Sequence, residues 1–252
     1  ARSNGITVGM QGDVGFFSLA VGKGLSTFEG GVLLVRDAEI RAALQAQGQR
    51  TKFSWWWELR RSVELLGYAA LYRPSGLGMA YGKPLAASLA RGDWVEAAGD
   101  GFDDMIPQHR LGRWRQAVGA RALQRLAAFQ QQTAEQACNR IAQLKACGFE
   151  VVEDARPHVQ GVWPVLLLRL PSPQCRDAML QAHWGDGSGL SLPFVHVLPD
   201  YGRYDHVLAA ARQDDVTQAR DWAQRLLAIS NSPWLDDARF ARLLGDLQQA
   251  VA

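Results

Sequence analysis

The residues best suited to chemistry are a serine and a lysine on a glycine-rich turn early in the sequence. The apolar, strand-like run Val14–Leu19 carries Ser18, and Lys23 follows five residues later between two glycines. A second strand-like run, Val32–Val35, comes directly after a Gly-Gly pair. Burial lowers the pKa of a lysine towards the range in which its amine is nucleophilic. A lysine held between buried strands suits a Schiff base with an aldehyde cofactor, and a surface lysine on an ordinary turn is the alternative.

This stretch resembles the lysine motif of the DegT/StrS family of pyridoxal-phosphate (PLP) sugar aminotransferases. Members have a Gly-Asp pair, a Gly-x-Phe-Ser segment, a lysine and then Glu-Gly-Gly. Here the counterparts are Gly12-Asp13-Val14-Gly15-Phe16-Phe17-Ser18, Lys23 and Glu29-Gly30-Gly31. The motif is specific over about thirty residues, and beyond it the likeness continues as pattern. The resemblance implies a fold-type-I, aspartate-aminotransferase-like α/β fold. Sugar dehydratases of this fold have a histidine in place of the lysine, whereas this chain keeps the lysine.

The resemblance also implies roles for individual residues. Lys23 would form the Schiff base with PLP and then move the proton between cofactor and substrate carbon, while Ser18 would bind the cofactor phosphate unless it only caps its own turn. Arg2 would lie beside the PLP ring. Arg113 would reach the partner subunit's phosphate, unless it is a solvated residue at a helix start. His196 would line the substrate entrance, unless it is an ordinary loop histidine.

The implied activity is transfer of an amino group, with glutamate as the expected donor, to a nucleotide-linked keto sugar for amino-sugar or polysaccharide synthesis. Family members are homodimers whose sites are built from both subunits. The sequence opens at Ala1 without methionine, and the family's aspartate that pairs with the PLP pyridine nitrogen would precede it. We therefore expect the C-terminal portion of a longer enzyme. A catalytically inactive fragment is the alternative.

The amino-acid composition indicates which binding partners and which cellular compartment to expect. The 252 residues are 48% hydrophobic and carry a net charge of +2, which indicates a substantial core and no nucleic-acid partner. Three cysteines and five histidines show no metal-ligand spacing, so no metal site is expected, and the odd cysteine count favours the cytoplasm. The turn Gly185–Gly189 lacks the strand and helix context of a dinucleotide-binding motif.

A tryptophan-rich block follows the lysine motif. Trp55, Trp56 and Trp57 lie beside Arg60 and Arg61 in a helix-compatible stretch that is apolar nearly all round and ends before a proline. Such a block could contact a membrane interface, in which case the chain could be a membrane-docking scaffold of a polysaccharide pathway instead of an enzyme. A buried helix or a dimer contact is the alternative. The stretch is too short and too charged to span a bilayer.

Periodicity gives the remaining elements. We expect helices from the Asp37 cap to about Gln47 and over Arg113–Ala146, and alternating strands and helices from Phe149 onward, with a short edge strand at Leu227–Ser230 and a last helix at Asp236–Val251. The resemblance implies two domains: residues 1–112, part of a PLP-binding large domain with a hydrophobic insert at 53–95, and residues 113–252, a linking helix and a small C-terminal domain. The enzyme hypothesis requires a loop-held, desolvated Lys23 beside a cavity.

Overall fold

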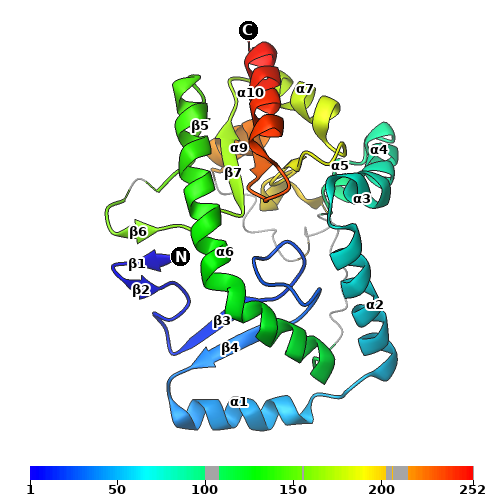
Figure 1. Ribbon diagram of the computed structural model, residues 1–252, viewed down its shortest axis with the longest axis vertical. Helices are drawn as coiled ribbons and strands as arrows, with labels where there is room; N and C mark the ends of the chain where they lie inside the picture. Colours follow the sequence, from blue (N-terminus) through cyan, green and yellow to red (C-terminus); the bar gives the residue numbers. More distant parts are fainter. Residues whose placement is uncertain (100–107, 155, 203–205, 207–214, 252) are drawn as a thin grey trace. The chain divides into compact units, whose positions relative to one another are not determined.

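The computed structural model describes residues 1–99, 108–154, 156–202, 206 and 215–251 (Figure 1). The chain divides into two compact units. Unit 1 contains Ala1–Ala70, Asp103–Glu135 and Glu153–Pro164, and unit 2 contains Leu71–Phe102, Gln136–Val152 and Val165–Ala252. This division differs from the predicted one at residue 112, because helix α6 (Arg113–Ala146) contributes to both units. The family-based boundary stays a prediction.

Unit 1 contains two small antiparallel sheets. One has the order β2-β1-β6, from β1 (Arg2–Ser3), β2 (Ile6–Thr7) and β6 (Val159–Gln160). The other pairs β3 (Val14–Ser18) with β4 (Gly31–Val35), in a register that places Ser18 opposite Gly31. This register brings both ends of the intervening lysine segment together.

The expectation that the lysine segment lies between buried strands is wrong. Phe16 in β3 is 67% exposed and Leu33 in β4 is 50% exposed. The reason is that the β3–β4 sheet has two strands only, so few side chains cover its faces. Apolar residues on both faces are typical of strands covered on both sides, and here that cover is incomplete.

Helices α1 (Ala38–Arg50) and α2 (Trp55–Leu71) follow β4. The Asp37 carboxylate accepts a hydrogen bond from the Ile40 N–H at 2.8 Å, which confirms the predicted cap. The third helix of unit 1 is the N-terminal part of α6, whose bounds are those predicted from periodicity. No helix among the described residues is both long and apolar enough to cross a membrane.

Unit 2 is built on a four-stranded antiparallel sheet with the order β5-β7-β9-β8, from β5 (Glu150–Val151), β7 (Val165–Arg169), β9 (Leu226–Ser230) and β8 (Leu190–Ser191). The prediction that β9 is an edge strand is wrong, because β8 pairs along its other side. Alternate residues of the two central strands, including Leu166 and Ile229, are fully buried and form the core.

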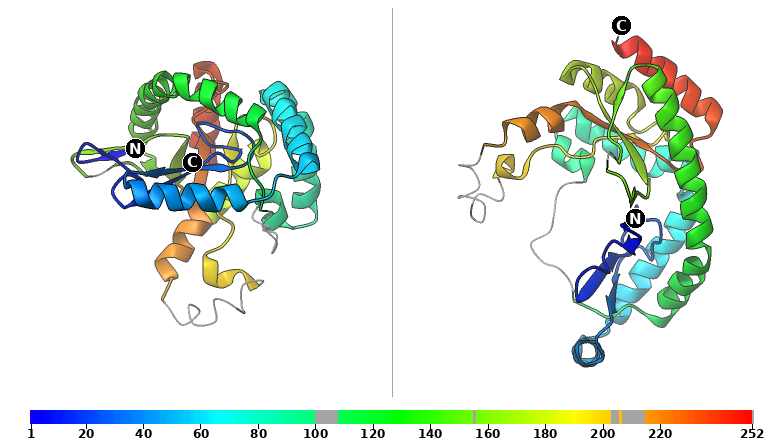
Figure 2. Two further views of the ribbon diagram at one scale, coloured as in Figure 1. Left: turned by 90° about the horizontal axis from the view of Figure 1, so that it is seen from below. Right: turned by 90° about the vertical axis from the view of Figure 1, so that its left-hand side faces the viewer.

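Besides the C-terminal part of α6, the described helices of unit 2 are α3 (Pro74–Leu77), η1 (Gly78–Gly82), α4 (Lys83–Ala90), α5 (Trp94–Ala98), α7 (Pro173–His183), η2 (Leu198–Asp200), α9 (Thr217–Arg225) and α10 (Asp237–Val251). Buried Arg140 of α6 joins α10 to the C-terminal part of α6. Figure 2 shows α10, in red, beside this part of α6, in green. It donates a hydrogen bond to the Leu235 carbonyl and lies 4.9 Å from the centre of the Phe240 ring. Burial lowers the pKa of Arg140, and Asp237 partly offsets that effect.

Candidate active site

The lysine loop, residues 19–30, is closed at its base by backbone hydrogen bonds. The Leu19 N–H donates to the Gly30 carbonyl at 2.9 Å, and the Thr27 N–H donates to the Leu19 carbonyl at 3.0 Å. Within the loop, the Lys23 N–H donates to the Ala20 carbonyl at 3.3 Å. Lys23 therefore sits on a turn whose two ends are tied together.

Three residues of the lysine loop, Gly22, Phe28 and Gly30, have φ in the left-handed range. Gly22, directly before the lysine, has φ 81°, which favours glycine. Phe28 has φ 70°, an uncommon conformation for a side chain of its size. Residues of α2 hold the Phe28 ring: Arg61 lies 5.7 Å from its centre, and Tyr68 meets it edge-on at 6.3 Å. Helix α2 thus constrains the strained end of the loop.

A buried ion pair braces the same end of the loop. Arg115 of α6 is fully buried and donates to both carboxylate oxygens of Glu58 of α2, at 3.0 and 2.6 Å. It also donates to the carbonyl of buried Thr27 at 3.3 Å. The Gly112 N–H gives Glu58 a third hydrogen bond at 2.9 Å. These contacts tie α2 and α6 to the loop.

The environment of Glu58 favours its charged form. Burial raises the pKa of the Glu58 carboxyl, but hydrogen bonds from Arg115 and Gly112, with the nearby positive charge, outweigh that effect. The net result is a pKa below the ordinary 4.5. Glu58 is therefore ionised at neutral pH, and the charge of buried Arg115 is compensated.

A second carboxylate fixes the Gly-Gly end of the loop. Glu29 accepts a hydrogen bond from the Trp57 indole at 3.1 Å, its carboxylate lies 2.9 Å from Nε2 of His109, and it forms an ion pair with Arg61. The Trp57 ring also lies 4.5 Å from the Arg61 guanidinium. Sequence reasoning missed this cluster and the Glu58–Arg115 pair. The available signal was the set of charged residues inside a largely apolar block: Glu58, Arg60, Arg61 and Glu64.

Lys23 and Ser18 lie on the same loop structure. Ser18, at the end of β3, is half-buried, and its hydroxyl oxygen accepts the Ala20 N–H at 3.3 Å. Lys23 is exposed to solvent. The prediction of a loop-held lysine is confirmed, but the prediction that it is desolvated is wrong, because the described residues around it form no enclosing wall. Lys23 lines neither of the two surface cavities described below.

The other predicted site residues share no described hydrogen bond or cavity with Lys23. Arg2 lines a cavity of about 540 Å³ with Asn4, Gly5, His158 and Gln160. Arg113 is the exposed first residue of α6, and neither arginine shares a described hydrogen bond or cavity with Lys23. His196 belongs to unit 2, where it is exposed and meets the Tyr201 ring edge-on at 5.3 Å.

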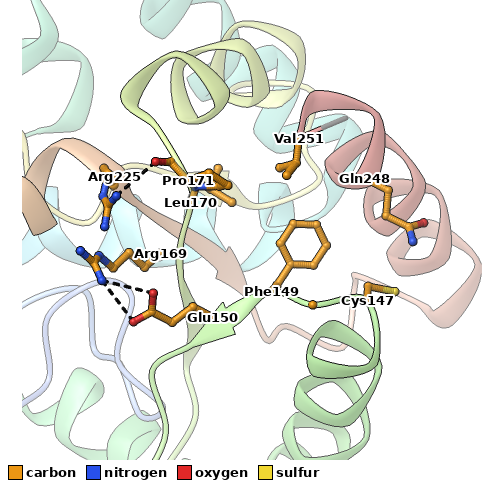
Figure 3. Close-up of a pocket in the computed structure, with 10 residues that line it drawn as sticks. Cys147, Phe149, Glu150, Arg169, Leu170, Pro171, Arg225, Gln248 and Val251 are labelled. Atoms are coloured by element: carbon orange, nitrogen blue, oxygen red, sulfur yellow. Dashed lines mark hydrogen bonds and ion pairs between the residues drawn. The ribbon is translucent and has the colours of Figure 1, made fainter.

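A cavity of about 480 Å³ in unit 2 contains two arginines but no predicted site residue (Figure 3). Arg169 pairs with Glu150 at 3.3 Å and with Asp221 at 2.7 Å. Arg225 pairs with Asp221 at 3.2 Å and donates to the Pro171 carbonyl at 3.1 Å. Both positive charges are therefore compensated within the protein, which argues against an anion site. Across the described ranges, no group of three histidine, cysteine or acidic residues could hold a metal ion.

Solved structures with a similar fold include several aminotransferases. The aminotransferase TlmJ from Streptoalloteichus hindustanus superposes with a TM-score of 0.63 at 17% identity and covers 99% of this chain. A putative sugar aminotransferase from Streptococcus pneumoniae, in its PMP form, gives 0.64 at 14% identity over 99% of this chain. A DegT DnrJ EryC1 StrS aminotransferase from Brucella abortus gives 0.61 at 17% identity over 100% of this chain.

These likenesses confirm the predicted fold-type-I α/β fold. The chain spans 55% of the length of the first two structures and 54% of the third. No family model matches the chain, and no curated protein matches it by sequence. The fold is thus established by structure, at identities too low to transfer an activity.

Proposed function

We propose that this chain provides the lysine-bearing part of a PLP-dependent aminotransferase, which moves an amino group from glutamate to a nucleotide-linked keto sugar. The observation that carries the proposal is Lys23 on a braced, glycine-rich loop, in a chain with the fold of sugar aminotransferases. The domain division at residue 112, a homodimeric state, a cytoplasmic location and a role in polysaccharide synthesis belong to the same proposal.

The Lys23 amine and the Ser18 hydroxyl suit two parts of a PLP molecule, its aldehyde and its phosphate. The Lys23 amine is exposed and free to react with an aldehyde, and no described side chain pairs with it. The Ser18 hydroxyl accepts one backbone N–H and keeps its proton available for a phosphate oxygen. PLP, when bound, supplies an electron-withdrawing ring next to the reacting carbon.

The residues of this chain would then act in distinct ways. Lys23 would hold the cofactor and, once its amine is released, carry a proton to or from the substrate carbon. Ser18 would orient the phosphate, and the Arg115–Glu58 pair would keep the loop in place from behind. Arg2 beside the ring and His196 at the substrate entrance are proposed on the family resemblance alone.

Enclosure of the ring would require more protein than the described residues provide. Lys23 is exposed, and electrostatic catalysis needs a site from which water is excluded. In the proposed homodimer, the second subunit would cover part of the site. Arg113 would reach the phosphate of the PLP bound to that second subunit. The exposure of Lys23 also favours a second candidate, a catalytically inactive fragment that cannot retain PLP.

Titration with PLP separates the two candidates. We expect the purified chain to gain a visible absorbance band that persists after desalting. A Lys23→Ala variant should fold normally but lack the band, whereas the matched control Lys83→Ala, which changes another exposed lysine, should keep it. Colour retained by Lys23→Ala contradicts the proposal, and a parent chain that stays colourless supports the inactive fragment.

A further inference from the structure

Helix α2 exposes an apolar face. Five large apolar side chains are between 45% and 83% exposed: Trp55, Trp56, Leu59, Val63 and Leu66. At 3.6 residues per turn, they fall within an arc of roughly 100° and extend about 16 Å along the helix. We call these five residues the α2 apolar face. Contiguous exposed apolar patches mark interaction sites more often than chance.

Two charged residues of α2, Glu58 and Arg61, point the other way, into unit 1. Glu58 is buried against Arg115, Arg61 pairs with Glu29, and Leu65 is buried beside them. These three positions lie within roughly 60° of one another on the opposite side of the helix. The usual arrangement of a surface helix, with apolar residues inward and charged residues outward, is therefore reversed.

The ion pairs fix this reversed orientation. Burying the α2 apolar face would require a rotation of roughly 140° about the helix axis. That rotation would separate Glu58 from the fully buried Arg115 and leave an uncompensated charge inside unit 1. The outward direction of the tryptophans is thus built into the packing.

The charges around the α2 apolar face are positive. Arg50 and Lys52 precede the helix and are exposed, and Arg60 borders the face with its side chain 63% exposed. The two acidic residues of this stretch are not free: Glu58 is buried, and Glu64 is shared between Arg60 and Arg61. Tryptophan and phenylalanine side chains next to basic residues match the interface of an anionic bilayer, where rings enter the headgroup region and cations meet lipid phosphates.

We propose that the α2 apolar face docks on the surface of an anionic lipid bilayer. Trp55 and Trp56 insert at the headgroup level with Phe53, which is 44% exposed, while Arg50 and Lys52 contact the charged headgroups. A second copy of this chain fits less well, because it would bring the same exposed positive charges to the interface without exposed acidic partners. The proposal stands independently of the aminotransferase activity.

Co-sedimentation with vesicles tests the docking. We expect the full chain to bind phosphatidylcholine vesicles that contain phosphatidylserine, more strongly than pure phosphatidylcholine vesicles, and to lose affinity as salt is raised. The double variant Trp55→Ser/Trp56→Ser should have a vesicle affinity at least about tenfold below that of the parent. Both residues are exposed, so circular dichroism and the melting temperature should match those of the parent.

A pair of leucine variants provides a matched control. Leu66 on the face is 59% exposed, and Leu123 on α6 is 61% exposed. Leu66→Ser should weaken vesicle binding several-fold, and Leu123→Ser should leave it unchanged. A parent chain that binds neither vesicle, or tryptophan and leucine variants that bind like the parent, overturns the proposal. Light scattering gives another outcome that overturns it: the parent is a dimer, the tryptophan variant is a monomer, and the two bind vesicles equally. The α2 apolar face would then bind a second copy of the chain.

Discussion

Replacing Glu58 with glutamine tests the brace behind the lysine loop. Glutamine keeps the size of the side chain and one acceptor oxygen, but it removes the charge that compensates Arg115. Arg115 is fully buried, and its remaining described acceptor is the Thr27 carbonyl at 3.3 Å. Removing one partner of a buried ion pair costs about 3–5 kcal/mol, and the retained amide oxygen keeps the expected loss near about 3 kcal/mol.

Urea unfolding, followed by tryptophan fluorescence, measures this loss as the difference in free energy of unfolding between parent and Glu58→Gln. The matched control is Glu64→Gln on the same helix. Glu64 also pairs with two arginines, but its side chain is 27% exposed, so a loss below about 1 kcal/mol is expected. Equal losses for the two variants, or a loss under about 1 kcal/mol for Glu58→Gln, would refute the reasoning.

The pH dependence of the same difference follows from the lowered pKa of Glu58. A carboxyl whose folded pKa lies below its ordinary 4.5 adds stability that is complete above pH 4.5 and is lost as the pH falls through the folded value. The gap between parent and Glu58→Gln should therefore be constant near neutral pH and should shrink in acid. A gap that widens below pH 4.5 would show that the linkage has the opposite sign.

Three further substitutions test local features of the fold. Gly112→Ala places a methyl group on the Glu58 carboxylate and should destabilise the chain by about 2 kcal/mol or more in urea, whereas an unchanged midpoint would show that Glu58 is not held there. Gly189→Ala should cost about 2 kcal/mol, because this glycine has φ 81° and its added Cβ would lie 2.5 Å from the Ser230 Cβ; normal stability would rule out this close approach. Asp37→Ala should fray the start of α1 at a cost of about 1 kcal/mol, seen as faster amide exchange there, and unchanged exchange would deny the cap a role.

The elements that follow from local signals could be predicted from the sequence. The 3.6-residue pattern gave the bounds of α6, and an aspartate before an apolar-periodic segment gave the start of α1. The glycines around Lys23 indicated a turn, and the structure shows that turn closed by backbone bonds. These features depend on residues within a few positions of one another, which is why reading along the chain finds them.

Features that depend on distant pairing could not be predicted. Glu58 and Arg115 are 57 positions apart, and no local pattern links them. The inward direction of Glu58 follows from that pairing, so the exposure of Trp55 and Trp56 was also beyond local reading. The same limit explains why β9 was wrongly predicted to be an edge strand. Its second neighbour, β8, has two residues only and is too short to give a pattern.

Mapping where PLP attaches tests the central claim most directly. The sequence contains four lysines, Lys23, Lys52, Lys83 and Lys145, and all four are exposed. After incubation with PLP below saturation and reduction with borohydride, peptide mass spectrometry reports the occupancy of each lysine. The account predicts that Lys23 carries most of the phosphopyridoxyl label and that Ser18→Ala lowers its share. Equal labelling of the four lysines, or an unlabelled Lys23, would contradict it.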